Sequence, residues 1–186
     1  MHEATASVRN ALEDDRAAIA AVVVAAFGAG AGREISELVG KLTVDPTAPP
    51  SGSLVATKGV DMVGHVLFTT ARLQRATRSV GATILAPLSV SPEQQGQSIG
   101  TRLVDEGLRT VREAGVDLVF VLGHPGFYSR FGFAPAGALG FDAPYPIPPH
   151  NAGAWMVHAL RPDLLGRVSG RVICADALDD PGYWRE

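Results

Sequence analysis

The order of hydrophobic and polar positions divides the chain into strand-like and helix-like segments. Short apolar or alternating runs predict strands, whereas apolar positions that recur every three or four residues predict helices. We expect helices at Ala17–Phe27, around Ile35–Leu42 and at Thr101–Ala114. We expect strands at Ala6–Arg9, Ser53–Lys58, Met62–Leu73, Ala82–Val90, Val116–Leu122, Ala154–Leu160 and Gly170–Ala175.

The first two helices differ in the surface they should bury. Ala17–Phe27 is apolar on all sides, which predicts a helix covered by its neighbours. Glycines at positions 28, 30 and 32 are expected to end this helix and loosen the loop that follows. In the second helix, apolar residues recur at i, i+3, i+4 and i+7, which predicts a single buried face made by Ile35, Leu38, Val39 and Leu42.

The stretch from Leu85 to Gly100 is the centre of the predicted structure. An apolar strand, Ala82–Val90, gives way to a polar turn that contains Pro92 and then to the helix that follows Gly100. The first amides of a helix have no partner within it, and the helix dipole adds positive potential there. We therefore expect an anion site suited to phosphate at this turn.

Pro87 interrupts the strand before this turn. Proline has no backbone N–H to donate, so either the strand lies at an edge there or it parts from its neighbour. The run Val116–Leu122 is nearly continuous in apolar residues, as in a strand buried on both faces and parallel to Ala82–Val90. If these two strands splay apart, the freed backbone groups could pair with an inserted ligand.

Composition narrows the functional classes. The 186 residues fit one domain, and a net charge of -3 gives no basic footprint for nucleic acid. The single cysteine, Cys174, excludes an internal disulfide and suits a reducing cytoplasm, and it is expected to be a small core residue. The apolar run Ala17–Gly32 is too short for a membrane span, and its acidic flank is wrong for a secretory signal.

Two common phosphate-binding patterns fail at the central turn. No lysine follows Gly100 as a P-loop requires, and the spacing of Gly96 and Gly100 does not match the dinucleotide fingerprint. The run Gln95-Gly96-Gln97-Ser98-Ile99-Gly100 instead resembles the [QR]-x-x-G-x-[GA] loop of the GNAT N-acetyltransferase superfamily. Ser98 stands where that pattern has its first glycine.

A second motif strengthens this resemblance. Gly123–Ala136 reads GHPGFYSRFGFAPA, which is similar to the G-[DH]-P-x-[YF]-Y-x-R-F-G-F form of the YhbS-type branch of the superfamily. The two motifs and their order cover roughly Leu85–Ala136. The resemblance implies an α/β (α+β) fold: one GNAT-like domain over residues 1–186, with a mixed, mostly antiparallel sheet of about six to seven strands, a splayed parallel pair and flanking helices.

The resemblance also implies a reaction and its residues. Acetyl-CoA would be the cosubstrate, with no metal, and a small-molecule or peptide amine would be the acceptor for a monomeric or homodimeric cytoplasmic enzyme. Tyr128 would give a proton to the departing thiolate, and His124 is a candidate base. The residues expected to bind acetyl-CoA are Leu88, Ser89, Val90, Gln95, Gly96, Gln97, Ser98, Ile99, Gly100 and Thr101.

Other interpretations remain open on the sequence alone. A non-catalytic acyl-CoA sensor could use the same fold, and a protein that binds a nucleotide phosphate is a third possibility. Cys174 has no activating base near it in the sequence. His65, His150 and His158 are expected to be ordinary surface or half-buried residues, and no pair of histidines has metal-ligand spacing.

Overall fold

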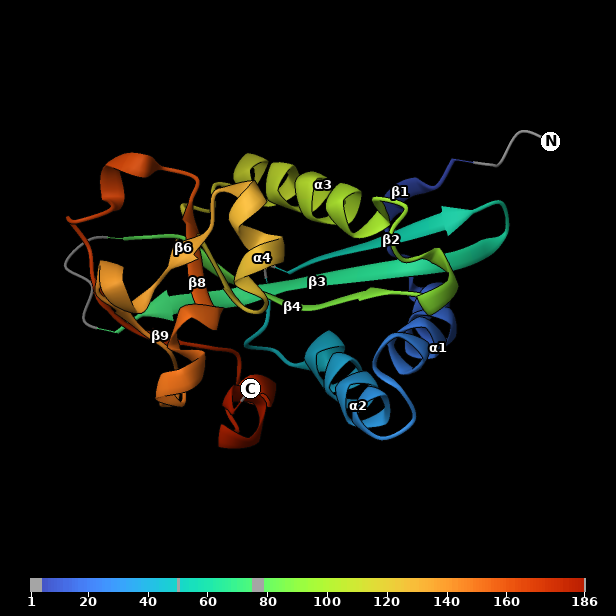
Figure 1. Cartoon of the computed structure of the whole chain (residues 1–186), viewed down its shortest axis with the longest axis horizontal. Coiled ribbons are helices and arrows are strands. Elements are labelled where there is room, and N and C mark those ends of the chain that lie inside the picture. Colours follow the sequence, from blue (N-terminus) through green and yellow to red (C-terminus); the bar gives the residue numbers. More distant parts are fainter. Residues whose placement is uncertain (1–4, 50, 75–78, 186) are drawn as a thin grey trace.

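The computed structural model describes residues 5–49, 51–74 and 79–185, and all descriptions below concern these residues. A twisted mixed sheet runs through the molecule, with helices on both of its faces (Figure 1). The main helices are α1 (Arg16–Phe27), α2 (Ala31–Val44), α3 (Ile99–Glu113) and the short α4 (Pro125–Tyr128). The strands are β1 (Ser7–Asn10), β2 (Gly52–Lys58), β3 (Asp61–Leu73), β4 (Ala82–Val90), β5 (Leu118–Leu122), β6 (Ala134–Pro135), β7 (Phe141–Asp142), β8 (Trp155–Ala159) and β9 (Gly170–Ile173).

The sheet has the predicted mixed and mostly antiparallel topology. Its main path is β1-β2-β3-β4-β5-β8-β6, in which only β4 and β5 are parallel neighbours. Within the described residues β9 pairs with the end of β3, and the two-residue β7 pairs in parallel with β9. The strands β2 and β3 form a hairpin, which closes where Lys58 pairs with Asp61. The seven-strand path matches the expected size, and β7 and β9 extend it.

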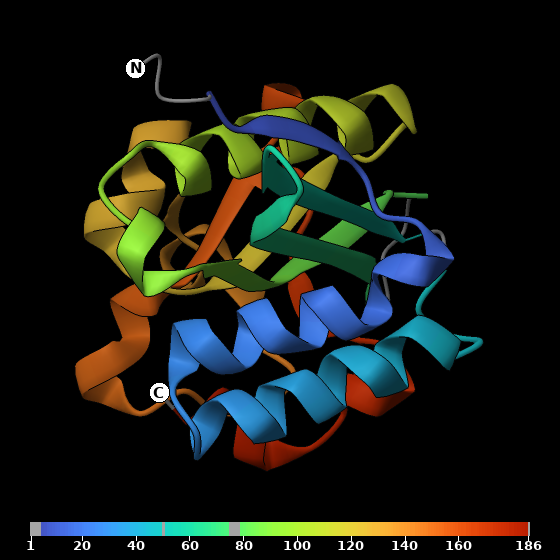
Figure 2. The ribbon, with the colours of Figure 1, turned by 90° about the vertical axis from the view of Figure 1, so that its right-hand side faces the viewer.

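The two faces of the sheet carry different helices. Figure 2 shows α3 on one side of the sheet and α1 beside α2 on the other. The buried side of α3 includes Leu103 and Val104, which pack in one cluster with Phe68 of β3. The opposite cluster joins residues of α1 and α2 to Leu67 and Phe120 of the sheet. Between them, these two cores fix the sheet in which β4 and β5 lie.

The expectation that the first helix is covered all round is wrong. Only Ile19, Val22 and Val23 of α1 are buried, and Phe27 at its end is 40% exposed. Its other positions are largely alanine, which favours a helix whether it is buried or exposed. Because the exposed positions are alanine rather than polar residues, the hydropathy pattern does not distinguish the buried face from the exposed one. Burial in α1 follows from its contacts with the sheet and α2.

The second helix is longer than predicted and includes Gly32, which we expected in the loop. A Cβ atom at Gly32 would lie 2.7 Å from the carbonyl oxygen of Val24, closer than real contacts allow. Gly32 therefore permits a close approach of α2 to α1, and its role is packing rather than flexibility.

The C-terminal part of the chain completes the sheet. The predicted strands at Ala154–Leu160 and Gly170–Ala175 are confirmed as β8 and β9, each slightly shorter than expected. In the parts of the chain that the structure describes, no helix is long and apolar enough to cross a membrane.

The start of α3 depends on an unusual backbone conformation. Ser98 precedes the helix with φ 60° and ψ 14°, and it is the one described residue other than glycine with a positive φ. A side chain in this left-handed region clashes with the local backbone, which costs roughly 1–2 kcal/mol. The loop pattern that the sequence resembles has glycine at this position. The left-handed backbone conformation accounts for that glycine, because glycine adopts it without a steric clash.

The close packing of α3 on β3 leads to a first prediction. A Cβ atom at Gly107 would lie 2.3 Å from Cε2 of Phe68, so Gly107→Ala should lower the free energy of unfolding by about 1–3 kcal/mol. Gly40 lies in α2, where an added Cβ atom would have no neighbour within 4 Å, and Gly40→Ala should raise stability by about 0.5–1 kcal/mol. Urea denaturation measures both; equal effects would contradict the packing described.

The conformation of Ser98 leads to a second prediction. Ser98→Gly should raise the free energy of unfolding by roughly 0.5 kcal/mol, since relief of strain exceeds the added chain entropy. Ser98→Val should lower it by about 1–2 kcal/mol, because a β-branched residue tolerates positive φ poorly. Chemical denaturation of the three proteins tests this order. A valine variant as stable as the wild type would show that Ser98 is not left-handed.

Candidate functional site

The strands β4 and β5 are paired along only part of their length. Their register joins Ala82 to Leu118, Thr83 to Val119 and Ile84 to Phe120, and it ends there. Beyond Ile84, β4 continues for six residues along β3, up to Val90 and the hydrogen bond from the Ser91 N–H to the Val63 carbonyl at 2.9 Å. The predicted parting of the two parallel strands is therefore present, and β3 holds the free part of β4 in place.

The register of β4 decides which backbone groups face the gap. In an antiparallel pair, residues alternate between hydrogen-bonded and non-hydrogen-bonded positions. The bond between Ser91 and Val63 makes Ser89 and His65 the next hydrogen-bonded pair. The main-chain groups of Leu88 and Val90 therefore point away from β3, toward the side that β5 has left. The N–H and carbonyl of Leu88 and the N–H of Val90 are therefore available at the gap, whereas the carbonyl of Val90 already accepts a hydrogen bond from Gln95.

A row of free amides follows the gap. Among the described residues, no protein group accepts a hydrogen bond from the six successive N–H groups of residues 96–101; the first bond of α3 runs from the Arg102 N–H to the Ser98 carbonyl at 3.0 Å. Gly96 and Ser98 have positive φ, which turns this segment into the helix. These unpaired amides at the N-terminus of a fifteen-residue helix are the arrangement from which the sequence predicts an anion site.

Side chains hold the loop between β4 and α3. Nε2 of Gln95 donates to the carbonyl of Val90 at 3.1 Å, which ties the loop back to the end of β4. Nζ of Lys58 donates to Oε1 of Gln94 at 3.2 Å and to Oε1 of Gln97 at 3.1 Å. Sequence reasoning missed Lys58, because it lies 36 residues before the loop and the chain around it shows only a hairpin turn.

One wall beside the gap is apolar. An ideal Cβ at Gly100 would lie 3.5 Å from Cζ of Phe127, 3.6 Å from Cγ2 of Val90 and 3.8 Å from Cδ2 of Leu88. The first turn of α3, the end of β4 and the segment after β5 therefore meet around Gly100. Ile99 is buried in the same cluster, and Thr101 is half-buried.

Tyr128 lies at the carboxyl end of β5. Its ring covers Gly123, where an added Cβ would lie 2.4 Å from Cε2 of the tyrosine, and it contacts Phe127 and Phe133 edge to face. The residue is 7% exposed, and no described residue hydrogen-bonds its hydroxyl. Burial raises the pKa of Tyr128 well above its ordinary value, because an apolar environment disfavours the phenolate. The phenol is therefore protonated at neutral pH.

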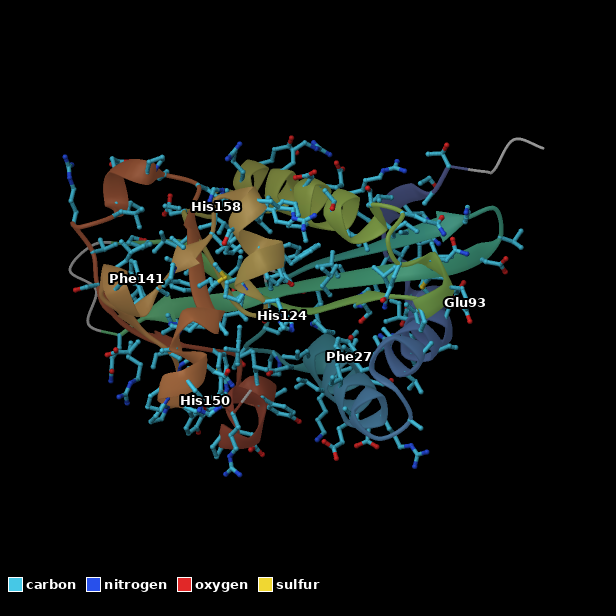
Figure 3. All side chains as sticks on the ribbon, in the orientation of Figure 1. Phe27, Glu93, His124, Phe141, His150 and His158 are labelled. Carbon is cyan, nitrogen blue, oxygen red and sulfur yellow. The ribbon has the colours of Figure 1, made fainter. Side chains whose placement is uncertain are left out.

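His124 lies between β5 and α4. Its carbonyl accepts hydrogen bonds from the amides of Phe127 and Tyr128, both at 3.0 Å, so it starts α4. His124 follows the end of β5 at Leu122, and Figure 3 shows its side chain apart from those of His150 and His158. His124 is exposed, and its ring has no hydrogen-bond or ion-pair partner among the described residues.

The expectation for His65 is wrong, because its side chain is completely buried. Nε2 lies 2.9 Å from the hydroxyl of Ser53, while Nδ1 has no partner among the described residues. Burial lowers the pKa of His65 to about 4, so the imidazole is neutral at pH 7. The alternation of the long strand β3 directs His65 toward α1, which its local sequence does not reveal.

Other chemistry has less support. Cys174 is buried, and burial raises the pKa of its thiol to about 12, so it is a poor nucleophile. Across residues 5–49, 51–74 and 79–185, no three histidine, cysteine, aspartate or glutamate side chains gather in a way that could hold a metal ion. The gap between β4 and β5 and the free amides beyond it are therefore the candidate functional site.

Comparison with known proteins agrees with this geometry. The Acetyltransferase (GNAT) domain family matches residues 7–136. The "Uncharacterized N-acetyltransferase YjhQ" of Escherichia coli strain K12 is 42% identical over 142 residues, which are 76% of this chain and 78% of that protein. The "Uncharacterized N-acetyltransferase YhbS" of the same strain is 36% identical over 112 residues, which are 60% of this chain and 64% of that protein.

Solved structures support the same assignment. The crystal structure of Escherichia coli YhbS in complex with CoA has a TM-score of 0.84 and 29% identity, covering 95% of this chain and 93% of that one. A GNAT family acetyltransferase from Brucella melitensis in complex with acetyl-CoA has a TM-score of 0.74 and 29% identity, covering 96% and 100%. On the match over residues 7–136 and the relatives above, the chain belongs to the GNAT acetyltransferase family.

Proposed function

We propose that this protein is an N-acetyltransferase that moves an acetyl group from acetyl-CoA to the amine of a small molecule or peptide. The observation that carries the proposal is the gap after Ile84, where unpaired main-chain groups of β4 lead directly to the free amides of the α3 N-terminus. The Brucella relative was solved with acetyl-CoA and YhbS with CoA, which supports the same ligand here.

The residues present fit acetyl-CoA. Its pantetheine arm contains amide groups that can pair with the main-chain groups of Leu88 and with the N–H of Val90, as a further strand would. Its diphosphate is an anion of the kind that the free amides from Gly96 to Thr101 can bind. The arm and the diphosphate are parts of one molecule. One such molecule can occupy both features, because only the short loop between β4 and α3 separates the gap from the amides.

The reaction requires two proton movements. When bound, acetyl-CoA supplies the acetyl group as a thioester. The amine nitrogen forms a bond to the carbonyl carbon, the carbon–sulfur bond breaks, the amine loses a proton and the sulfur gains one. We assign proton removal from the amine to His124, and N–H groups of β4 at the gap would stabilise the charge that develops on the carbonyl oxygen.

Tyr128 is assigned to the sulfur. Its raised pKa means that the phenol keeps its proton until a strong base appears beside it. A thiolate formed in the same dry surroundings is also a stronger base than in water, because burial disfavours its charge. The phenol can therefore hydrogen-bond to the departing sulfur and give it the proton.

The test of the proposed function is acetyl transfer to a panel of amines by the wild type and Tyr128→Phe. Phenylalanine keeps the ring contacts, so kcat should fall about 100-fold while the Kd for acetyl-CoA stays the same. Release of free CoA thiol measures turnover, and calorimetry measures binding. Tight binding with no turnover in either protein would favour a non-catalytic sensor, and an unchanged kcat would remove Tyr128 from the reaction.

The base is tested separately. His124→Gln should lower kcat about 100-fold with little change in the KM for acetyl-CoA, because the imidazole acts on the acceptor. His150→Gln is the matched control, since His150 is another exposed histidine and lies in the turn before β8. Steady-state kinetics of both variants decides the matter. If His124→Gln turns over like His150→Gln, another group takes the proton.

A further inference from the structure

A cavity of about 130 Å³ lies between the helices α1 and α2 and the strands β2 and β3. These helices cover the face of the sheet opposite α3 (Figure 2). Exposed Arg16 and Gly40 line the cavity together with buried Val39 and Leu67, so it runs from the surface down to the sheet. A protein cavity of about 150 Å³ holds one benzene molecule, so this one has room for roughly six or seven non-hydrogen atoms.

Small residues leave this space open. Ala20 of α1 and Gly40 of α2 both line the cavity, and an added Cβ atom at Gly40 would have no neighbour within 4 Å. Nearer the loop that joins the two helices, by contrast, Gly32 lies directly against the backbone of Val24. The cavity is therefore found toward the start of α1, where small side chains replace such close contact.

The floor of the cavity is polar. Ser53 of β2 and His65 of β3 line it and hydrogen-bond to each other through Nε2 of the histidine, at 2.9 Å. Nδ1 of the completely buried His65 has no partner among the described residues. Ser89 lies opposite His65 on β4, so the two side chains share a face of the sheet, and its buried hydroxyl also has no partner in this part of the chain. Buried polar groups without partners are costly, and a bound molecule that completes their hydrogen bonds removes that cost.

The mouth of the cavity is positively charged. Among the described residues that line it, Arg16 alone carries a charge at pH 7, because burial keeps His65 neutral. The carboxylate of Glu13 lies 3.6 Å from the guanidinium of Arg16, but both side chains are exposed. An exposed ion pair of this kind is weak, so Arg16 remains able to bind another anion. The cavity thus offers a cation at its mouth and a hydrogen-bonding nitrogen at its floor.

We propose that this cavity binds a short carboxylic acid that also carries a hydroxyl or keto group, with the carboxylate at Arg16 and the second group at Nδ1 of His65. The side chains of Ile19, Val39 and Leu67 would contact its carbon chain. Nδ1 donates to an oxygen in one tautomer of the imidazole and accepts from a hydroxyl in the other. The inference does not depend on the proposed function, because none of the lining residues belongs to β4, β5 or the loop before α3.

The test compares three probes of suitable size. 3-Hydroxybutyrate carries both groups, butyrate lacks the hydroxyl, and butane-1,3-diol lacks the carboxylate. In isothermal titration calorimetry at low salt, 3-hydroxybutyrate should bind with a Kd of about 1 mM or lower, and the other two at least about fivefold more weakly. Proton–nitrogen NMR observes the imidazole directly, and the Nδ1 signal of His65 should shift with 3-hydroxybutyrate but not with butyrate.

Two variants test the two ends of the cavity. Arg16→Gln should weaken binding of 3-hydroxybutyrate about fivefold and leave butane-1,3-diol unaffected. Arg33→Gln is the matched control, because Arg33 is an exposed arginine of α2 that does not line the cavity. His65→Leu should reduce the affinity for 3-hydroxybutyrate to that for butyrate, with circular dichroism to check that the variant is folded. If it does not fold, Arg16→Gln and the NMR signal of the wild type decide the matter.

Three results would overturn the inference. Equal affinity for all three probes would show that neither polar end contributes to binding. Equal loss in Arg16→Gln and Arg33→Gln would show that only the overall charge of the protein matters. A titration with no saturation up to about 20 mM 3-hydroxybutyrate, and no shift at His65, would mean that water alone fills the cavity.

Discussion

The arrangement of the candidate site depends on β4 being paired on one side and not on the other. Along β3 the pairing continues to Val90, whereas along β5 it stops at Ile84. A buried backbone group without a partner costs about 1–3 kcal/mol, so an open stretch of strand persists only where water or a ligand can reach it. The long strand β3 makes this opening rigid, since it holds β4 in position where β5 no longer does.

The loop after β4 divides its tasks among different groups. Backbone amides face outward for an anion, and the glutamine side chains bond back to the protein, Gln95 to Val90 and Gln94 and Gln97 to Lys58. Ser98 adopts an unfavourable left-handed backbone conformation, which directs the chain into α3. The loop therefore uses its side chains for its own shape and leaves its amides for a ligand.

The sequence predicted the parts of the fold that local patterns determine. The apolar runs located the central strands. Pro87 indicated that β4 leaves a neighbour, because proline lacks the N–H that a ladder needs, although the pairing with β5 ends earlier, at Ile84. The glycine-containing turn located the row of free amides before α3, which is the candidate anion site. Helix bounds were less accurate, and α1 was predicted to be buried all round because its many alanines give no periodic contrast.

What the sequence could not show were contacts between distant segments. Lys58 contacts the loop across the hairpin, His65 is buried beneath helices of the opposite face, and Gly32 serves a helix contact rather than a loop. Each depends on how the sheet twists and which element covers it. The roles proposed for Tyr128 and His124 are of a different kind, since they depend on a ligand, and kinetic measurements of the variants decide them.

The most direct test of the account is hydrogen exchange at the backbone amides of β4, with and without acetyl-CoA. The account predicts that the amides of Leu88 and Val90 exchange faster than that of Ser89 in the free protein, because of these three amides only that of Ser89 points toward β3. With acetyl-CoA added, Leu88, Val90 and the amides from Gly96 to Thr101 should all slow. Slow exchange of Leu88 and Val90 in the free protein, with no change on addition of acetyl-CoA, would contradict it.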